Sequence, residues 1–434
     1  MLILGMGLTG ISCLKFFILK NIYPKILDFN KDPKYIQHVK NFKNIIYHVG
    51  SINYKWIQES ELIIVSPGIS LYHPAIIFAK LKGIEVIGDI ELFVRETNTP
   101  IIAITGSNGK STVATMVKDI LKFSGIKVYL GGNIGLPVLN ILNHSAEIYV
   151  IELSSFQLET VISLKARVAT VLNISPDHMN RYPYGITEYI KQKLKIYNNA
   201  MFSVLNLDDN LSFNPKIKAY PHITFGTLKG DYHLKEKSGN YWLFYKSKKL
   251  LNTKHLKISG KQNYVNALSA LSIVHKFKIN IEISLKALKN FSGLPHRFQI
   301  ICKRNDVTWI NDSKSTNIGS TKSAIENILP YAKKKIRLIL GGDGKSANFS
   351  LLIPYLKNKK IKIYCYGMSK NILFQLCPEK SIRLKTLNNT VYFIAKIVKP
   401  GDIVLLSPAC SSLDQFSNFK ERGNTFIKLI KELH

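Results

Sequence analysis

The sequence predicts an α/β protein with three domains and mostly parallel sheets. Short apolar runs rich in β-branched residues alternate with amphipathic segments along the chain, which is typical of parallel sheets covered by helices. Glycine- or serine-rich turns follow many of these runs. The chain has 434 residues, which is too long for one hydrophobic core. We therefore expect domains at residues 1–88, 89–293 and 294–434.

The first domain opens with a glycine turn. Gly5, Gly7 and Gly10 follow an apolar strand with G-x-G-x-x-G spacing, and Asp28 lies in the next expected strand. This pattern is typical of a Rossmann-like domain that binds a dinucleotide, with the acid on a ribose hydroxyl. The strands expected in this domain are 25–29, 62–65 and 84–87. Taken alone, the pattern leaves an NAD-dependent oxidoreductase open.

A second glycine loop, TGSNGKST, follows the apolar strand 101–104 and opens a helix at Lys110. Backbone N–H groups at such a helix N-terminus converge on one point and attract phosphate. Only Gly109, Lys110 and Ser111 fit the G-x-x-x-x-G-K-[ST] pattern, so a plain strand-to-helix turn is the alternative. The strand and the helical periodicity after it favour a P-loop-type site for a nucleoside triphosphate.

Other polar residues follow the neighbouring expected strands. Glu152 comes directly after strand 148–151, and the sequence SPDH, ending at His178, comes after strand 168–173. A carboxylate beside a phosphate loop can hold Mg²⁺ together with a hydroxyl such as that of Ser111. Singly, such residues are more often caps or loop residues, and Lys193 could be an exposed helix lysine. Jointly they predict a metal–nucleotide site.

The rest of the chain comprises a turn-rich, β-like section at 202–256, an amphipathic helix, and a Rossmann-like last domain that begins near LPHRF. The strands expected in the last domain are 307–311, 336–340, 361–366 and 403–406, followed by the loops DSKSTN, GGDGKS, Gly367 and SPACSSLDQF. In open parallel sheets, ligands bind at the carboxyl ends of the strands.

The formal net charge of +32 makes nucleic-acid binding an alternative function, because strongly basic proteins bind phosphate backbones. The lysines are spread along the chain, however, and the clusters at 333–335 and 357–360 precede apolar strands, where solvated turns belong. We therefore expect no nucleic-acid partner. The five cysteines lack metal-ligand spacing and predict neither a disulfide framework nor a zinc site. No apolar run is long enough to span a membrane, so we expect a cytoplasmic protein without a membrane partner.

Taken together, the motifs resemble those of the Mur ligases over essentially the whole chain. They are TGSNGKST, GGNIGLP (131–137), IELSSFQLE (151–159), LNISPDHMNRYP (172–183), SGKQNYVNALSAL (259–271), LPHRF, NDSKSTN, GGDGKS and SPACSSLDQF. The similarity is greatest to members that add D-glutamate to UDP-N-acetylmuramoyl-L-alanine in peptidoglycan synthesis, and the D-N-P-R motif of diaminopimelate-adding members is absent. Another amino-acid ligase of the same family is the remaining alternative.

The resemblance implies an ATP-dependent ligase that acts on small molecules through an acyl phosphate. We expect the protein to be a monomer. The first domain would bind the UDP-sugar rather than NAD, the central domain ATP, and the last domain the amino acid. The implied ATP contacts are Gly106, Ser107, Asn108, Gly109, Lys110, Ser111, Thr112, Asn263, Arg297 and Asp312. The implied UDP-sugar contacts are Leu8, Thr9, Asp28, Gly68, Asn133, Ser154 and His178, and those for D-glutamate are Thr316, Lys345, Ser412, Leu413 and Phe419.

The resemblance also implies a set of catalytic and metal-binding residues. Two Mg²⁺ ions are expected, one near Ser111 and Glu152 and one near His178 and Lys193. A lysine ammonium cannot ligate a cation, so Lys193 would carry a carbamate derived from CO₂. The resemblance implies a catalytic role for five residues, which are Lys110, Glu152, His178, Lys193 and Lys314.

Overall fold

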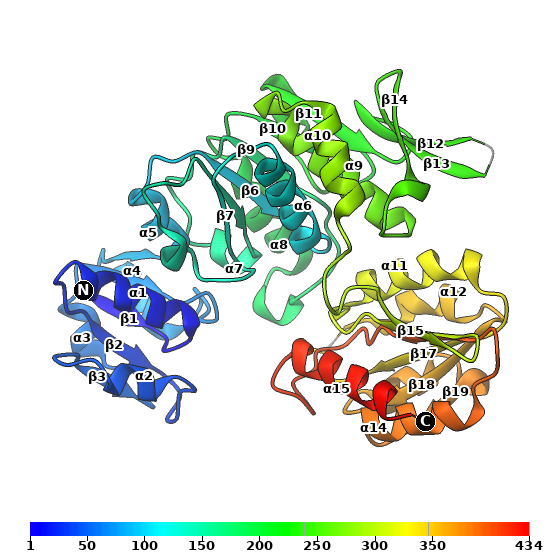
Figure 1. The fold of residues 1–434 in the computed structure, drawn as a ribbon. Coiled ribbons are helices and arrows are strands. Elements are labelled where there is room, and N and C mark those ends of the chain that lie inside the picture. Colours follow the sequence, from blue (N-terminus) through cyan, green and yellow to red (C-terminus); the bar gives the residue numbers. More distant parts are fainter. Residues whose placement is uncertain (238, 346, 434) are drawn as a thin grey trace. The chain divides into compact units, whose positions relative to one another are not determined.

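The computed structural model describes residues 1–237, 239–345 and 347–433 and contains three α/β sheets in chain order (Figure 1). The predicted fold class is therefore confirmed. The chain divides into two compact units. Unit 1 comprises Met1–Ile174, Thr187–Asn252 and Val265–Lys289, and unit 2 comprises Ser175–Ile186, Thr253–Tyr264 and Asn290–His434.

The first sheet, in unit 1, is parallel and has the order β3-β2-β1-β4-β5. Its strands are β1 (Leu2–Leu4), β2 (Lys25–Asp28), β3 (Tyr47–Val49), β4 (Leu62–Val65) and β5 (Glu85–Ile87). The helices are α1 (Leu8–Leu19), α2 (Ile36–Lys40), α3 (Tyr54–Gln58), α4 (Pro74–Leu81) and α5 (Asp89–Arg95). Helix α1 packs so close to the loop after β1 that a Cβ on Gly10 would lie only 1.8 Å from the Gly5 carbonyl oxygen. The first glycine fingerprint thus serves close packing as well as the turn.

The central sheet, also in unit 1, has the order β14-β13-β12-β11-β10-β9-β6-β8-β7. Strands β7 to β11 are parallel to β6, whereas β12, β13 and β14 form an antiparallel meander. The strands are β6 (Ile101–Thr105), β7 (Val128–Gly132), β8 (Ile148–Glu152), β9 (Val168–Val171), β10 (Ser203–Asn206), β11 (His222–Gly226), β12 (Tyr232–Lys237), β13 (Asn240–Tyr245) and β14 (Lys248–Asn252). The helices are α6 (Lys110–Phe123), α7 (Ser155–Leu158), α8 (Gly185–Leu194), α9 (Lys261–Val274) and α10 (Ile281–Asn290). The last three each cross a boundary between the units, so that Lys261–Tyr264 of α9 belong to unit 2.

Three strand ends in this sheet differ from the prediction. Strand β6 continues to Thr105 rather than ending at residue 104. Strand β9 stops at Val171 rather than Asn173, because the carbonyl of Asn173 accepts a hydrogen bond from Ser107 N in the phosphate loop (2.8 Å). Glu152 is the last residue of β8 rather than the residue after it, since it still pairs with Ile104 of β6.

The third sheet, in unit 2, has the order β15-β16-β20-β17-β18-β19 and is parallel except for β15. Its strands are β15 (Gln299–Arg304), β16 (Val307–Asn311), β17 (Ile336–Gly341), β18 (Ile361–Tyr366), β19 (Ser381–Arg383) and β20 (Ile403–Leu406). The helices are α11 (Ile318–Ile328), α12 (Ile353–Leu356), α13 (Lys370–Gln375), α14 (Leu387–Ile397) and α15 (Phe419–Glu432). Successive strand residues point to opposite faces of the sheet and pack into two hydrophobic cores, so that Leu338 lies in one core and Ile339 in the other.

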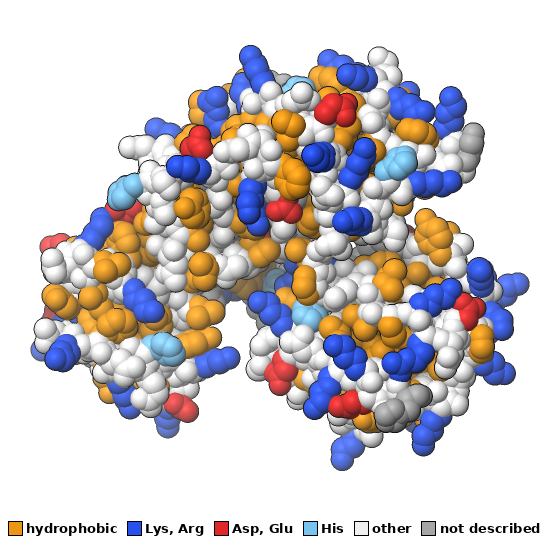
Figure 2. Space-filling model, in the orientation of Figure 1, with side chains coloured by type: hydrophobic (Ala, Val, Ile, Leu, Met, Phe, Trp, Pro, Cys, Tyr) orange, Lys and Arg blue, Asp and Glu red, His pale blue; other side chains and the backbone are white. Residues whose placement is uncertain are grey.

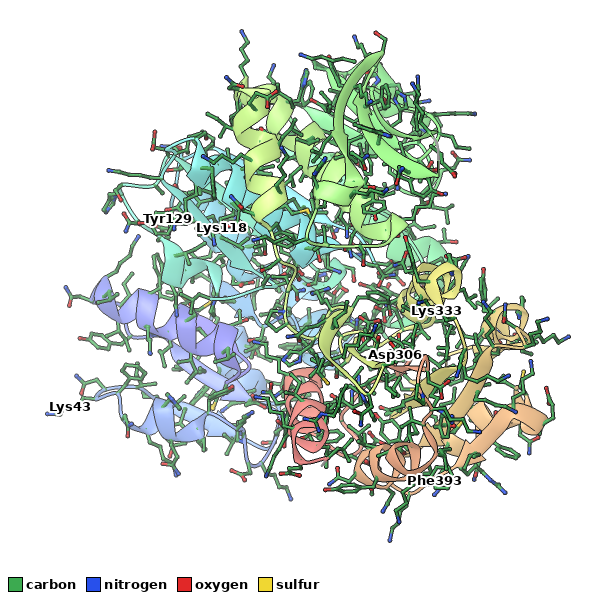
Figure 3. The ribbon with its side chains drawn as sticks, turned by 45° about the vertical axis from the view of Figure 1, so that its right-hand side comes forward. Lys43, Lys118, Tyr129, Asp306, Lys333 and Phe393 are labelled. Atoms are coloured by element: carbon green, nitrogen blue, oxygen red, sulfur yellow. The ribbon has the colours of Figure 1, made fainter. Side chains whose placement is uncertain are left out.

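Lysine and arginine side chains are scattered over the face shown in Figure 2, and acidic side chains are sparse there. Lys333 lies at the surface between the 3-10 turn Leu329–Tyr331 and β17 (Figure 3), as the sequence predicts for this lysine cluster. All five cysteines are free thiols. Among the described residues, no helix is both long enough and apolar enough to cross a membrane.

Candidate functional site

The phosphate loop lies between β6 and α6 in unit 1. Gly106 and Gly109 have positive φ angles of 150° and 83°, which other residues rarely adopt. Space is restricted as well, because a Cβ on Gly109 would lie 2.7 Å from Asn266 Oδ1. Gly109 caps α6, and Lys110, Ser111 and Thr112 form its first turn. The loop therefore leads directly into the N-terminus of α6, which is the arrangement that an anion site requires.

Asn173 holds the loop from the segment that follows β9. Its side chain accepts a hydrogen bond from Asn108 N (2.8 Å) and donates one to Asn108 O (3.0 Å). A side-chain amide can make this reciprocal pair because it carries both a donor and an acceptor. The prediction did not include Asn173, although an asparagine directly after an apolar strand is the signal that could have found it.

Two lysines converge on the start of the loop. Lys110 Nζ donates to Gly106 O (2.7 Å) and Ser107 O (3.0 Å), and Lys193 Nζ donates to Gly106 O (2.9 Å). Lys193, on α8, is only 1% exposed, and its ammonium lies 4.7 Å from the Tyr189 ring centroid. The alternative of an exposed helix lysine is therefore wrong. The structure brings Lys110 and Lys193 together, as a shared site requires.

Glu152 ends β8 beside the start of the phosphate loop, because it pairs with Ile104 of β6. Asn133 holds it twice, donating from Nδ2 to Glu152 Oε1 (2.7 Å) and from its backbone N to Glu152 O (2.8 Å). A Cβ on Gly132 would lie 2.3 Å from Glu152 O, so this approach needs glycine. Glu152 is 1% exposed, and Oε2 is buried with no hydrogen-bond partner among the described residues.

A buried carboxylate oxygen without a partner is costly unless a cation or donor meets it. The donor set fits Mg²⁺, which takes oxygen ligands and is commonly held by one or two carboxylates together with substrate phosphates. Ser111, 5% exposed in the first turn of α6, could supply a hydroxyl. The described residues contain no group of three or more His, Cys, Asp or Glu side chains with metal-site geometry. Substrate phosphates and water would therefore supply the other ligands.

The candidate UDP-sugar residues of the first sheet lie at the carboxyl ends of its strands. Asp28, the last residue of β2, accepts hydrogen bonds from Met6 N at Oδ2 (2.7 Å) and from Asn30 N at Oδ1 (2.9 Å). Leu8 and Gly68 are exposed, and Thr9 is half-buried in the first turn of α1. Asp28 thus ties the glycine loop after β1 to β2, and the loop residues stay accessible.

Ser154 has a local structural role. It caps α7 through a capping box, in which its Oγ accepts from Gln157 N (3.1 Å) and its backbone N donates to Gln157 Oε1 (3.1 Å). Such a cap stabilises a helix N-terminus by about 1 kcal/mol.

The remaining predicted site residues lie in unit 2. His178 is half-buried with φ 57°, and its Nε2 lies 3.6 Å from Asp177 Oδ1. Asn263, on α9, donates from Nδ2 to Ser259 O (2.8 Å). Four loops of the third sheet carry the others: Arg297 precedes β15, Asp312, Lys314 and Thr316 follow β16, Lys345 follows β17, and Ser412 and Leu413 follow β20. Phe419 opens α15.

The candidate amino-acid residues follow three adjacent strands. In the sheet, β20 lies between β16 and β17, so the loops carrying Thr316, Ser412 and Lys345 emerge side by side. Two of these loops are joined, because Asp343 N donates to Ser411 O (3.0 Å) and Ser411 N to Asp343 O (2.8 Å). Ser346, the last residue of GGDGKS, lies outside the described residues. The carboxyl edge at such a reversal of strand order is where open parallel sheets bind ligands.

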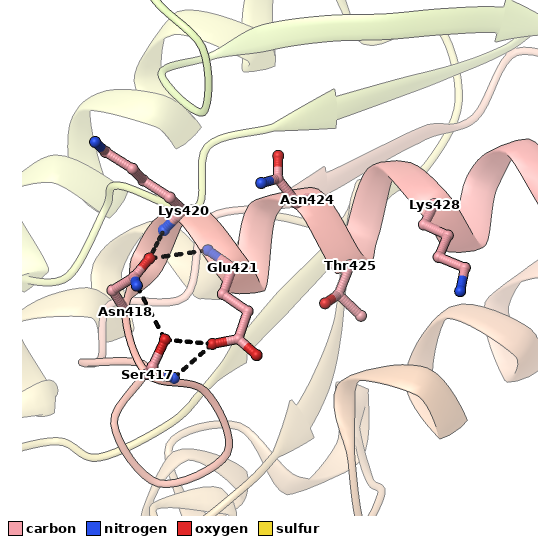
Figure 4. Close-up of a pocket in the computed structure, with 7 residues that line it drawn as sticks. All are labelled: Ser417, Asn418, Lys420, Glu421, Asn424, Thr425 and Lys428. Atoms are coloured by element: carbon pink, nitrogen blue, oxygen red, sulfur yellow. Dashed lines mark hydrogen bonds between the residues drawn. The ribbon is translucent and has the colours of Figure 1, made fainter.

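Lys314 and Phe419 meet at this edge, since the Lys314 ammonium lies 4.1 Å from the Phe419 ring centroid. Phe419 is held at the start of α15, where Asn418 Oδ1 caps the helix by accepting from Lys420 N and Glu421 N (Figure 4). The pocket in Figure 4 runs along the outer side of α15 and contains none of the predicted D-glutamate residues.

Asp312, two residues before Lys314, is buried. It accepts hydrogen bonds from Phe298 N (3.0 Å), Ser407 Oγ (3.0 Å) and Ser315 Oγ. Burial raises the pKa of Asp312 to about 6, although these bonds and the Arg297 charge partly oppose the rise.

Comparison with known families covers all three sheets. Residues 1–88 match "Mur ligase MurD-like, N-terminal domain", residues 104–274 match "Mur ligase middle domain", and residues 296–410 match "Mur ligase, glutamate ligase domain".

Among curated proteins, UDP-N-acetylmuramoylalanine–D-glutamate ligase of Buchnera aphidicola subsp. Baizongia pistaciae is 60% identical over 432 residues, covering all of this chain and 97% of that protein. The ligase of the same name from Escherichia coli K12 is 47% identical, covering 99% and 98%. Among solved structures, a pseudomurein peptide ligase type C from Methanothermus fervidus matches with a TM-score of 0.65 at 17% identity, covering both chains fully. MurF ligase from Thermotoga maritima in complex with ADP matches with a TM-score of 0.61 at 17% identity, covering 88% of this chain and 97% of that chain. The chain therefore belongs to the Mur ligase family.

Proposed function

We propose that this chain catalyses the ATP-dependent addition of D-glutamate to UDP-N-acetylmuramoyl-L-alanine in peptidoglycan precursor synthesis. The observation that carries this is full-length identity of 47–60% to ligases of that name. The phosphate loop of unit 1 and the three-loop edge of unit 2 support it. We assign the UDP-sugar to residues 1–88, ATP to 89–293 and the amino acid to 294–434.

The reaction needs an activated carboxylate, because a carboxylate is a poor electrophile and its oxygen a poor leaving group. ATP would transfer its γ-phosphoryl group to the L-alanyl carboxylate, giving an acyl phosphate and ADP. The amine of D-glutamate would then attack the acyl carbon, and phosphate and a proton would leave as the amide forms. Negative charge grows on phosphoryl and acyl oxygens in these steps. Lys110 and Lys314 can stabilise it, and losing one such group typically costs about 10²- to 10³-fold in rate.

Glu152 and Ser111 are the residues we expect to hold Mg²⁺ near the phosphates, and His178 and Lys193 those for a second ion. Bound Mg²⁺ would neutralise phosphate charge and orient the γ-phosphoryl group. Lys193 can act as a ligand only after its amine adds to CO₂, forming a C–N bond and releasing a proton to give a carbamate. Lys193 is buried, and its Nζ donates to the same Gly106 carbonyl oxygen as that of Lys110.

The test is phosphate release from ATP, Mg²⁺ and UDP-N-acetylmuramoyl-L-alanine with each candidate amino acid in turn. We expect release with D-glutamate and none above background with L-glutamate, L-alanine, L-lysine or diaminopimelate. Release with another amino acid alone would assign the chain to a different activity within its family. The same assay with Asn263→Ala, Arg297→Ala and Asp312→Asn, read as the KM for ATP, tests their predicted ATP contacts.

A further inference from the structure

Arg422, in the second turn of α15, is fully buried with 0% exposure. Its guanidinium donates from Nε to Ser313 Oγ (3.0 Å) and from Nη2 to Ser313 O (2.8 Å) and Cys410 O (3.1 Å). Nη1 donates to Ser411 O (3.3 Å) and Gly341 O (3.4 Å). A planar guanidinium can hold several acceptors in one fixed arrangement, which a lysine ammonium cannot reproduce.

These acceptors belong to three different loops. Ser313 follows β16, Cys410 and Ser411 follow β20, and Gly341 ends β17. They are the loops that carry the candidate D-glutamate residues, and their strands are neighbours in the sheet. One buried side chain therefore joins the three walls of the candidate amino-acid site.

The same network reaches the two groups that meet at the edge of the site. Ser313 Oγ, which accepts from Arg422, donates to Phe419 O (2.8 Å). Lys314 follows Ser313 directly, and its ammonium lies 4.1 Å from the Phe419 ring centroid. A displaced Arg422 would therefore shift the backbone that carries both Lys314 and Phe419.

The guanidinium of Arg422 makes no direct ion pair within the described residues, although the carboxylates of Asp343 and Asp414 lie close enough to act on the same Cys410 thiol. No carboxylate of the described residues lies within ion-pair distance of its guanidinium, and every acceptor named above is a carbonyl or hydroxyl oxygen. The other buried arginine of this sheet differs, because Arg337 pairs with Asp402 (2.7 Å) at the amino ends of the strands. A buried guanidinium without a direct ion pair is costly, and its field favours an anionic ligand nearby.

We propose that Arg422 is a positioning residue for the amino-acid substrate, holding the three loops in register and supplying positive potential that favours a dicarboxylate. This rests on the proposed function. Arg422 does not touch the reacting atoms in this scheme. Its effect should therefore be seen in the KM for D-glutamate rather than in that for ATP.

The experiment compares Arg422→Lys and Arg422→Met with wild type in the phosphate-release assay. Arg422→Lys keeps the positive charge and loses the planar guanidinium, whereas Arg422→Met loses both. We expect the KM for D-glutamate to rise about 10-fold in Arg422→Lys and about 100-fold in Arg422→Met, with the KM for ATP within about 3-fold of wild type. If Arg422→Met does not fold, the comparison of Arg422→Lys with its control decides the question.

Arg337→Lys is the matched control, because it loosens another buried arginine at the opposite edge of the same sheet. It should lower the melting temperature about as much as Arg422→Lys and leave the KM for D-glutamate unchanged. An equal rise of that KM in both variants, or an unchanged KM in Arg422→Lys, would overturn the proposal. Wild type without D-glutamate-dependent phosphate release would instead contradict the proposed function, and the role of Arg422 with it.

Discussion

The ammonium groups of Lys110 and Lys193 donate to the same acceptor, the carbonyl oxygen of Gly106, at 2.7 and 2.9 Å. The two nitrogens are therefore no more than about 5.6 Å apart. Like charges this close repel, and the repulsion is stronger where water is excluded. Phosphate near Lys110, or conversion of Lys193 to an anion, would relieve it. The pair thus favours the chemistry proposed for both residues.

We predict that Lys193 carries a carbamate. Wild-type protein equilibrated with ¹³C-labelled bicarbonate should show a carbamate signal by NMR, and Lys193→Ala should lack it. Activity should fall at least about 10-fold when CO₂ is removed and return with bicarbonate, because a metal ligand is lost and restored. Lys191→Ala, which removes an exposed lysine of the same helix, should keep both signal and activity. A signal that persists in Lys193→Ala would assign the carbamate elsewhere.

Lys110→Ala should abolish ligation while leaving binding of UDP-N-acetylmuramoyl-L-alanine largely intact. Removing a charge-stabilising donor typically lowers the rate about 10²- to 10³-fold. Phosphate release and calorimetric titration with the nucleotide sugar measure the two effects separately. Lys118→Ala, further along α6, is the control and should behave as wild type. Unchanged turnover in Lys110→Ala would refute the role of the phosphate loop.

Gly10→Ala should destabilise the protein although alanine favours helices more than glycine. The new Cβ would lie 1.8 Å from Gly5 O, so α1 must move away from the sheet. We expect a loss of about 2 kcal/mol or more in urea unfolding. Gly7→Ala, with no atom within 4 Å of its Cβ and φ −76°, should stay within about 0.5 kcal/mol of wild type. Equal stability of the two variants would show that the close approach is not restrictive.

Asp312→Asn should become more stable relative to wild type as pH rises from about 4 to 7. Folding raises the pKa of Asp312 from its ordinary value of 3.8 to about 6, so the native state binds the proton more tightly. Its stabilising contribution is complete below pH 4 and is lost as pH rises through about 6. The measurement is the difference in melting temperature between variant and wild type at each pH. A difference that does not vary with pH would contradict it.

Asp306→Asn is the control of opposite sign. The Lys303 ammonium lowers the pKa of this exposed carboxyl, so its contribution is present at neutral pH and lost on acidification. The melting temperature of Asp306→Asn should therefore differ little from that of wild type, and it should fall further below it as pH rises.

The sequence by itself determined many of the elements and the glycine- and serine-rich turns that follow them. Local periodicity placed β16, β18 and β20 at the residues observed, and the glycines of TGSNGKST predicted the phosphate loop before α6. These signals are local, because alternation, helical spacing and turn chemistry act over a few residues. The resemblance to the Mur ligases rests on the same short motifs in order.

Only the tertiary structure decided which of those elements are neighbours. The sheet places β6 between β8 and β9, which brings Glu152 and Asn173 to the phosphate loop, and it places β20 between β16 and β17. That order also accounts for three further features: the burial of Lys193, the hydrogen bond from Asn133 to Glu152, and the hydrogen bonds of Arg422. These contacts join residues far apart in the chain, and burial depends on what packs against a segment rather than on its own residues. No local pattern carries that information.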